Sequence, residues 1–182
     1  MARLVYSLGV SLDGYIEDPD GNIASVPGED MHRIANEQAR EAQALLYGRR
    51  MFELMEPYWT DVAGRQDEVP DVEAEFARAY VETPRIVFSD TLETVPDGVR
   101  LVRSADAHDE VERLKERPGG HLDLGGAELA ASLFDLVDEV AMWVSPVVVG
   151  GGKRFFPEVR AEFTFVEARP LDGGLLYVRY ER

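Results

Sequence analysis

The chain lacks cysteine, has only three histidines and contains no long apolar run. Without cysteine it forms no disulfide, no thiolate nucleophile and no Cys-based zinc site. Its histidines, His32, His108 and His121, lie far apart without the spacing of a zinc-binding helix, so we expect no metal. No apolar stretch reaches the ~18 residues of a membrane span, and residues 1–16 lack the apolar core and cleavage site of a secretory signal. We therefore expect a cytoplasmic protein with no membrane partner.

Positive charge is also scarce, because 19 lysines and arginines stand against 35 aspartates and glutamates, for a formal net charge of −16. Nucleic-acid-binding proteins usually carry a basic stripe. None is visible here, which predicts that nucleic acid is not a partner. The chain is 45% hydrophobic and 30% charged, as ordinary globular proteins are. Its 182 residues are enough for a full core, and we expect one domain over residues 1–182.

Strand and helix patterns alternate along most of the chain. Apolar or alternating runs predict strands at residues 4–10, 44–47, 85–89, 99–102, 122–125, 140–149, 163–168 and 175–180. Helical spacing predicts helices at residues 30–44, 49–55, 71–82 and 105–117 and another after Gly126, with loops at 17–28 and 57–70. Alternation followed by two final strands indicates an α/β fold with a mixed, mostly parallel sheet and an antiparallel C-terminal edge.

The most informative stretch is residues 122–152, LDLGGAELAASLFDLVDEVAMWVSPVVVGGG. A strand ends in Gly125-Gly126 and a helix begins at once. Paired glycines let bare backbone approach a phosphate, and a helix N-terminus supplies free N–H groups and partial positive charge. The motif therefore suggests a nucleotide or another phosphorylated ligand. The same pattern also suits a glycine-rich βα turn that holds no ligand.

Gly48-Arg49-Arg50 likewise follows a strand and opens a helix, and Ser89 ends another strand. Two guanidiniums beside a helix N-terminus can clamp a phosphate. The carboxyl ends of parallel strands lie together at one edge of a sheet, so these junctions should converge. Solvent-exposed helix arginines are the alternative interpretation. Lys153 and Arg154 follow three glycines that lack P-loop spacing, and they either face a ligand or stay solvated.

Three carboxylates, Asp13, Glu29 and Asp30, flank the first strand and the loop after it. Such groups can deliver a proton in catalysis. A carboxylate at a helix start is also a common cap, because it satisfies free N–H groups, and this interpretation suits Asp30.

Five segments carry a resemblance to a known family: SLDGYI at 11–16, LLYGRRMFE at 45–53, VFS at 87–89, LGGAELAASL at 124–133 and LVDEVAMWVSPVVVGGGKRFFP at 136–157. In this order they resemble the dihydrofolate-reductase-like family. The resemblance is to the branch shared with the C-terminal reductase domain of the bifunctional riboflavin-biosynthesis deaminase/reductase. It covers nearly the whole chain and implies a three-layer α-β-α fold. It also implies NADPH as cofactor and hydride transfer to a C=N or C=O bond of a small heterocycle or opened sugar.

The resemblance also assigns cofactor-binding positions. The residues that fall on them are Gly9 and Ile16 beside the nicotinamide, Gly48, Arg49 and Arg50 at cofactor phosphates, Ser89 at the adenosine 2′-phosphate, and Gly125, Gly126, Ala127 and Glu128 at the pyrophosphate turn. The loop at 17–28 resembles the mobile loop that covers the cofactor. Met51 departs from the family pattern, because a threonine commonly stands there and its hydroxyl contact with a phosphate is missing.

The same resemblance assigns substrate-side residues. Asp13 and either Glu29 or Asp30 are candidate proton donors, and Lys153 and Arg154 are candidates for gripping the substrate. The chain carries no deaminase signature with zinc-binding His and Cys, so it resembles a stand-alone reductase. The resemblance implies one of two substrates, either the ribosylaminouracil of riboflavin synthesis, 5-amino-6-(5-phosphoribosylamino)uracil, or a folate or pterin.

Two further expectations follow from the resemblance. The peptide between Gly125 and Gly126 should be cis, as in folate-reducing members, which is a costly conformation. The C-terminal strands and Trp143 should form an apolar surface on which two copies pair as a homodimer. A non-catalytic nucleotide-binding or sensor protein on the same fold, and a structural homodimer subunit with empty glycine turns, are the alternatives.

Overall fold

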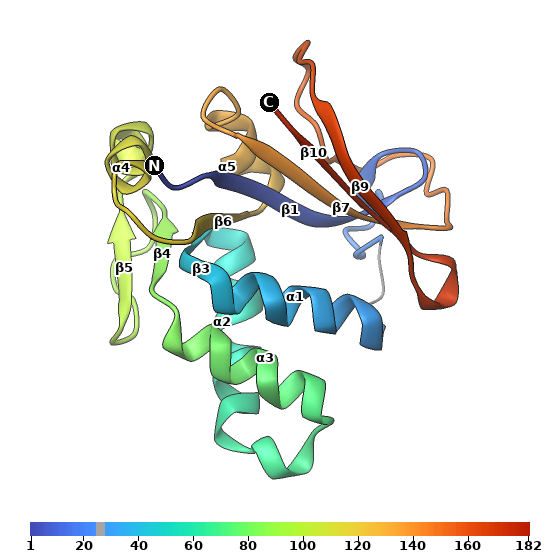
Figure 1. Cartoon of the computed structure of the whole chain (residues 1–182). Helices are drawn as coiled ribbons and strands as arrows, with labels where there is room; N and C mark the ends of the chain where they lie inside the picture. The colour runs from blue at the N-terminus through green and yellow to red at the C-terminus, as the bar shows by residue number, and fades with distance from the viewer. Residues whose placement is uncertain (25–27) are drawn as a thin grey trace.

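The centre of the protein is a mixed sheet. The computed structural model describes residues 1–24 and 28–182, and within them the sheet has eight strands in the order β5-β4-β3-β6-β1-β7-β10-β9 (Figure 1). The parallel strands are β5 (Val99–Val102), β4 (Arg85–Phe88), β3 (Ala42–Gly48), β6 (His121–Gly125), β1 (Leu4–Ser11) and β7 (Glu139–Ser145). β10 (Leu176–Glu181) runs antiparallel to β7, and β9 (Thr164–Pro170) antiparallel to β10. The predicted antiparallel C-terminal edge is confirmed.

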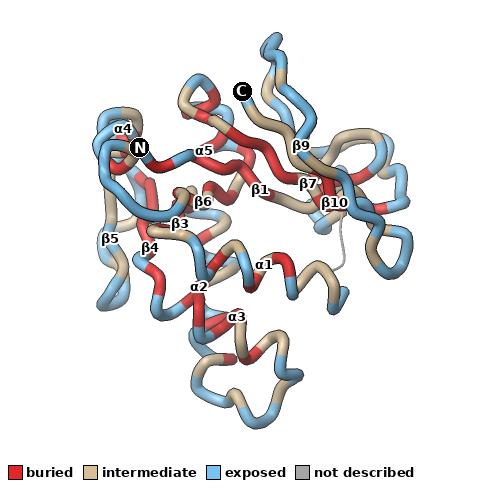
Figure 2. The backbone as a smooth tube through the Cα atoms, in the orientation of Figure 1, coloured by how far each residue is buried: buried red, intermediate tan, exposed pale blue. Residues whose placement is uncertain are grey.

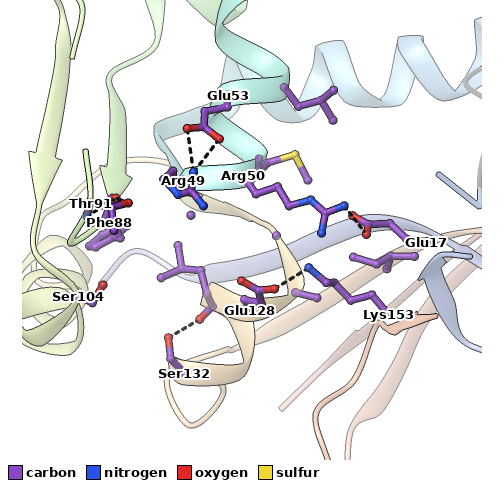
Figure 3. A pocket seen from close by; sticks show the side chains of 18 of the residues that line it. Glu17, Arg49, Arg50, Glu53, Phe88, Thr91, Ser104, Glu128, Ser132 and Lys153 are labelled. Carbon is purple, nitrogen blue, oxygen red and sulfur yellow. Dashed lines mark hydrogen bonds and ion pairs between the residues drawn. The ribbon is translucent and has the colours of Figure 1, made fainter. Parts of the chain in front are cut away.

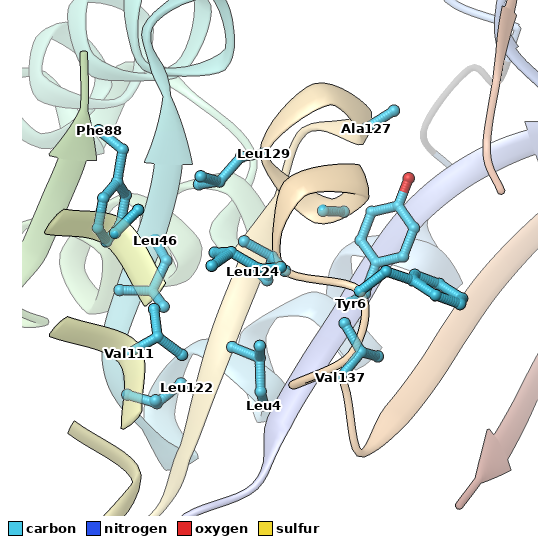
Figure 4. Packing of buried hydrophobic residues seen from close by; sticks show 14 of the residues in the cluster. Leu4, Tyr6, Leu46, Phe88, Val111, Leu122, Leu124, Ala127, Leu129 and Val137 are labelled. Carbon is cyan, nitrogen blue, oxygen red and sulfur yellow. The ribbon is translucent and has the colours of Figure 1, made fainter. Parts of the chain in front are cut away.

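Helices cover both faces of the sheet, which gives the expected three layers. One face carries α1 (Glu29–Glu41), α2 (Arg49–Gly64) and α3 (Asp71–Glu82), and the other carries α4 (Ala107–Lys115) and α5 (Ala127–Ser132) (Figure 1). Strand alternation explains this, because neighbouring residues point to opposite faces. Leu4 and Tyr6 of β1 pack with residues of α4 and α5 (Figure 4), whereas Val5 packs with Ile34 of α1.

Burial is concentrated in the middle of the sheet and falls off at its C-terminal edge (Figure 2). Leu46, Leu122 and Leu124 lie in central strands and are fully buried. Most of β9 is exposed, and as the last strand in the order it leaves one edge unpaired within the described residues. Every helix within residues 1–24 and 28–182 is too short or too polar to cross a membrane.

A short ribbon lies beside the main sheet. β2 (Tyr15–Glu17) pairs antiparallel with β8 (Lys153–Arg154), so that Glu17 stands opposite Lys153. Gly152 precedes this pair with φ +114°, and a Cβ there would stand 2.0 Å from the carbonyl oxygen of Glu17. Only glycine allows this close approach of the two segments. The predicted 17–28 loop begins in β2, and its residues 25–27 lie outside the described residues.

Two boundaries differ from the sequence prediction by four residues or more, and several others by one to three. The helix predicted at 49–55 continues to Gly64, so the loop predicted at 57–70 was wrong over its first half. Pro57 does not end the helix, because Phe52, Trp59 and Val62 form one buried stripe that holds both sides of it against the core. The strand predicted to reach residue 149 ends at Ser145, directly before Pro146, whose nitrogen cannot donate to a ladder. Short 3₁₀ turns occupy Gln66–Glu68, Ser104–Asp106 and Asp172–Gly174.

Candidate functional site

A cleft of about 1190 Å³ opens at the carboxyl ends of β3, β4 and β6. Ligands of open α/β sheets bind in this position, outside the strand ends. The predicted residues that line it are Ile16, Gly48, Arg49, Arg50, Ser89, Gly126, Ala127, Glu128 and Lys153. The sequence therefore identified residues from separate segments that the fold does bring together. Figure 3 shows the charged and hydroxyl side chains around the cleft.

The first turn of α2 opens into this cleft with unsatisfied backbone donors. Its N-cap is Gly48, and no side chain caps the helix. The first N–H groups of a helix have no intrahelical partner, so here they are available to a ligand. Arg49 and Arg50 follow directly and line the same cleft. This end of α2 thus combines free N–H groups, the positive end of a helix dipole and two guanidiniums.

The glycine turn before α5 forms the neighbouring wall. Gly126 has φ +105° and caps α5 without a side-chain hydrogen bond. A Cβ at Gly125 would lie 2.7 Å from Cε1 of Tyr47, so glycine is needed for the ring of Tyr47 to pack there. The peptide between Gly125 and Gly126 is trans, because the described residues contain no cis peptide. The predicted cis bond was therefore wrong: the left-handed φ of Gly126 makes the turn instead, and the argument from strain does not apply.

Each cation that lines the cleft is paired with a carboxylate that also lines it, among the described residues. Arg49 Nη1 lies 3.2 Å from Glu53 Oε1, one helical turn along α2. Arg50 Nη2 lies 3.0 Å from Glu17 Oε2. Lys153 Nζ lies 2.6 Å from Glu128 Oε1 and, through this hydrogen bond, holds the pKa of Glu128 below its usual value. These three cations are therefore compensated by carboxylates of the cleft, and an anionic ligand competes with those carboxylates for them.

The end of the cleft at β4 and β5 is built from small polar groups. Ser89 Oγ accepts hydrogen bonds from the backbone N–H groups of Thr91 and Leu92, at 3.2 and 3.1 Å. Asp90 Oδ1 accepts one from the N–H of Ser104 at 2.9 Å, and this bond holds the pKa of Asp90 below its usual value. An ionised carboxylate with a fixed direction therefore stands at this end.

The remaining predicted residues lie outside the lining of the cleft. They are Gly9, Gly125 and Arg154 among the predicted binding residues, and Asp13, Glu29 and Asp30 among the predicted proton donors. Gly9 pairs with Trp143 between β1 and β7. Arg154 stacks on Tyr15, with its guanidinium carbon 5.0 Å from the ring centroid.

The three predicted proton donors have local partners instead. Asp13 accepts hydrogen bonds from Ser11 Oγ at 2.7 Å and from the N–H groups of Val149 and Gly150, and the bond from Ser11 is the main cause of its lowered pKa. A carboxylate that stays ionised is a poor proton donor near neutral pH. Glu29 pairs with Arg33 on α1, and Asp30 accepts from the N–H of Asp172. These contacts favour structural roles for all three.

Sequence reasoning missed a carboxyl group inside the sheet. Asp123 lies in β6 between Val5 of β1 and Leu45 of β3, two residues before Gly125. Burial raises its pKa to about 7, with no charged group or hydrogen bond contributing. A lone aspartate in an apolar strand pattern gives no sequence signal for this. Asp90, Glu53 and Glu17 were also missed; Asp90 and Glu17 depend on contacts between separate segments, whereas Glu53 pairs with Arg49 within α2.

The family model of the RibD C-terminal domain matches residues 2–177. The chain belongs to the RibD C-terminal domain family. The resemblance inferred from the five segments is thereby confirmed. A relative in Bacillus subtilis (strain 168), the uncharacterized protein YyaP, is 30% identical over 98% of this chain and 94% of its own length.

Three solved structures have the same fold as this chain. A candidate riboflavin biosynthesis protein from Shewanella sp. PV-4 superimposes with a TM-score of 0.70 at 24% identity, over 100% of this chain and 99% of its own. Dihydrofolate reductase from Enterococcus faecalis, complexed with NADP(H) and RAB-propyl, gives 0.69 at 17% identity, over 99% and 96%. The deaminase/5-amino-6-(5-phosphoribosylamino)uracil reductase from Thermotoga maritima gives 0.68 at 19%, over 99% of this chain and 56% of that one. At these identities the likeness establishes the dihydrofolate-reductase-like fold.

Proposed function

We propose that this protein is an NADPH-dependent reductase that transfers a hydride to a small pyrimidine- or pterin-type heterocycle. The observation that carries the proposal is the meeting of the uncapped N-terminus of α2, Arg49 and Arg50 with the glycine turn of β6 in one cleft. Free N–H groups, a helix dipole and guanidiniums at strand ends are the donor set that dinucleotide phosphates require. Family membership supports the same conclusion.

The residues present suit a dinucleotide. Neither Gly48 nor Gly126 carries a side chain, and no side chain caps either helix, so among the described residues no side chain occupies the donors that would hold phosphates. Arg49 and the backbone at Gly126 and Ala127 would hold the phosphates, and Ser89 the adenosine end. When bound, the nicotinamide supplies the hydride.

The side chains of the cleft would position the substrate and exclude water from the reacting atoms. Ile16, Met51 and Leu54 line the cleft with apolar surface and would exclude water from the reacting atoms. Lys153 lines the same space and would hold a substrate anion in exchange for its pairing with Glu128. The substrate class is inferred from relatives whose names specify uracil and dihydrofolate reduction.

Titration with NADPH tests the cofactor site. Thermal shift or the fluorescence of Trp59 and Trp143 should report binding, and Arg49→Met should weaken it about tenfold or more, because a charge-assisted hydrogen bond to phosphate is lost. Arg33→Met is the matched control, since Arg33 also forms an exposed i,i+4 pair with a glutamate but stands on α1, outside the cleft. Equal losses for the two variants would contradict the assignment.

Turnover separates catalysis from binding alone. Oxidation of NADPH should accelerate when 5-amino-6-(5-phosphoribosylamino)uracil or dihydrofolate is added. NADPH binding without turnover on a panel of such heterocycles would favour the alternative, a nucleotide-binding or sensor protein on the same fold.

We also propose a homodimer that pairs through the β9–β10 edge. Phe165, Val166 and Leu176 are exposed there, and an unpaired strand with apolar side chains is a natural pairing surface. Trp143 is 5% exposed and packs on Tyr177, so the expectation that it belongs to this surface was wrong. Light scattering should give twice the 20.3 kDa chain mass, and Phe165→Glu should return the monomer.

A further inference from the structure

The charges around the cleft do not balance. Its described lining holds three cations, Arg49, Arg50 and Lys153, and each is paired with one carboxylate of the same lining. Asp90 is a further carboxylate of the lining, and it faces no lysine or arginine that lines the cleft within ion-pair distance. The described lining therefore holds one carboxylate more than it holds cations, and the guanidinium of Arg103 lies close to Asp90 but outside this lining. The formal net charge of the whole chain is −16. A ligand that brings many negative charges meets opposition at Asp90.

Asp90 occupies a defined end of the cleft. Thr91 and Ser104 stand at one side in Figure 3, Glu17 and Lys153 at the other, and Arg49 and Glu128 between them. A dinucleotide whose pyrophosphate lies at the start of α2 would extend in both directions from there. The β2 end offers apolar Ile16 and Ile23 and the cation Lys153, which suit a reacting ring and an anionic substrate. The β4 end offers hydroxyl groups and Asp90, which suit a ribose.

The carboxylate of Asp90 is ionised and aimed. The N–H of Ser104 fixes Oδ1 at 2.9 Å, and the side chain of Ser104 also hydrogen-bonds the carboxylate, so that both bonds hold the pKa of Asp90 below its usual value. The neighbouring guanidinium of Arg103 lowers the pKa of Asp90 but donates to the carbonyl oxygens of Ser89 and Leu92, so its hydrogen bonds are directed at the backbone. A carboxylate in this setting accepts a hydrogen bond from a ribose 2′-hydroxyl and repels a 2′-phosphate.

Arg49 is already paired with a carboxylate of the cleft. Arg49 stands toward the side of Thr91 and Ser104 in Figure 3, and both of its contacts go to Glu53, at 3.2 and 3.3 Å. Displacement of Glu53 by the pyrophosphate is common to both dinucleotides. Only a 2′-phosphate brings a further negative charge toward Asp90.

We propose that Asp90 is a specificity-determining residue that favours a dinucleotide without a 2′-phosphate, so that NADH is bound at least as well as NADPH. This inference rests on the proposed function and deepens it. Asp90 selects the cofactor through the ribose, while the contacts at the start of α2, common to both dinucleotides, provide the binding. The family resemblance implies NADPH as the cofactor, and this proposal adds NADH as a second cofactor that the same cleft binds.

The experiment compares Asp90→Asn with the wild type and with Asp97→Asn. Asp97 lies in the same β4–β5 connection, is exposed and does not line the cleft, so its variant removes one negative charge from the same region. Dissociation constants are measured for NADPH and NADH, and for 2′,5′-ADP against 5′-AMP, which carry only the adenosine end. Asn keeps the acceptor for Ser104, and urea midpoints verify that both variants fold.

Asp90→Asn should tighten NADPH and 2′,5′-ADP about tenfold relative to NADH and 5′-AMP, because a like charge near the 2′-phosphate is removed. Asp97→Asn should leave both ratios within twofold, and the effect of Asp90→Asn should shrink as salt rises. Unchanged ratios, with NADPH bound tightly by the wild type, would overturn the role of Asp90 and leave the proposed reductase standing. Absence of binding by either dinucleotide to all three proteins would overturn both.

Discussion

Two glutamates of α2 form ion pairs with arginines over nearly the same distance, but one pair is buried and the other is exposed to solvent. Arg85 Nε lies 3.0 Å from Glu56 Oε2, and both side chains are 7% exposed. Arg49 Nη1 lies 3.2 Å from Glu53 Oε1, and the two side chains are 52% and 48% exposed. Glu53 and Glu56 are three residues apart on α2, so one helix carries a buried and a solvated version of the same pair.

The buried pair acts as a joint between elements. Arg85 begins β4, Glu56 lies in α2, and Tyr80 of α3 donates its hydroxyl to Glu56 at 2.9 Å. Arg85 Nη1 donates to the carbonyl oxygens of Tyr80, Val81 and Thr83 at the end of α3. The solvated pair has no such partners and can exchange one anion for another. Surroundings, not pair length, therefore separate a structural contact from a ligand-ready one.

The largest expected effect comes from breaking the buried joint. Glu56→Gln leaves the guanidinium of Arg85 buried without its counter-charge, and we expect a loss of about 3–5 kcal/mol in the free energy of unfolding. Urea unfolding followed by circular dichroism measures it. Glu53→Gln is the matched control on the same helix and should change stability by less than about 0.5 kcal/mol. Similar losses of unfolding free energy for the two variants would contradict a structural role that is confined to the buried pair.

Asp123 is a half-buried carboxyl with no hydrogen-bond partner among the residues that the structure describes, and it sharpens the comparison. Burial raises the pKa of Asp123 to about 7, whereas an aspartate in the unfolded chain titrates near 3.9. The unfolded state therefore releases its proton first. The stability associated with the protonated form is complete below about pH 4 and is lost as pH rises through about 7.

Asp123→Asn should therefore stabilise the protein at pH 8 by about 1–3 kcal/mol, because it removes an unpaired buried charge, and should change little at pH 4. Thermal unfolding across this pH range measures the difference between the two curves. Asp172→Asn, an exposed substitution in the turn after β9, is the control and should leave the pH dependence as it is. A pH-independent gain for Asp123→Asn would contradict the raised pKa.

The smallest change in stability is expected for the ion pair between Glu17 of β2 and Arg50 of α2. Glu17→Gln frees Arg50 from a contact in which the arginine side chain is 59% exposed, so stability should fall by no more than about 1 kcal/mol. Affinity for a dinucleotide should rise by about two- to fivefold, because phosphate no longer competes with a resident carboxylate. Isothermal titration at low and high salt measures this gain. A loss of affinity would indicate that Glu17 assists binding.

Much of the fold could be predicted from periodicity, and the exceptions have physical causes. The helix predicted at 71–82 coincides with α3, because its apolar residues repeat at helical spacing without interruption. The extension of α2 through Pro57 could not be predicted, since proline usually ends a helix. The charged Glu56 also conceals the buried stripe to which it belongs, because its burial depends on Arg85, far along the chain.

The candidate site divides in a similar way. Glycines and arginines at strand-to-helix junctions, such as Gly48, Arg49 and Gly126, were identified because the topology of a parallel sheet brings its strand ends together. Of the carboxylates that neutralise the cleft, Glu128 was identified with the glycine turn, whereas Glu17 and Glu53 could not be identified among 35 acidic residues. The partner of Glu17, Arg50, comes from another segment. The sequence suggested Asp13 for proton transfer because it does not reveal the hydrogen bonds that Asp13 accepts from the N–H groups of Val149 and Gly150. Those bonds depend on a turn that forms only in the folded chain.

The β2–β8 ribbon has a kinetic consequence. Glu17 and Lys153 are cross-strand neighbours, and they reach to opposite walls of the cleft, Glu17 to Arg50 of α2 and Lys153 to Glu128 of α5. The close approach at Gly152 leaves the two strands little room to slide past each other. A molecule that enters or leaves must therefore disturb both walls in one event. We expect a residence time governed by one concerted step, which a change in either ion pair would alter for the whole cleft.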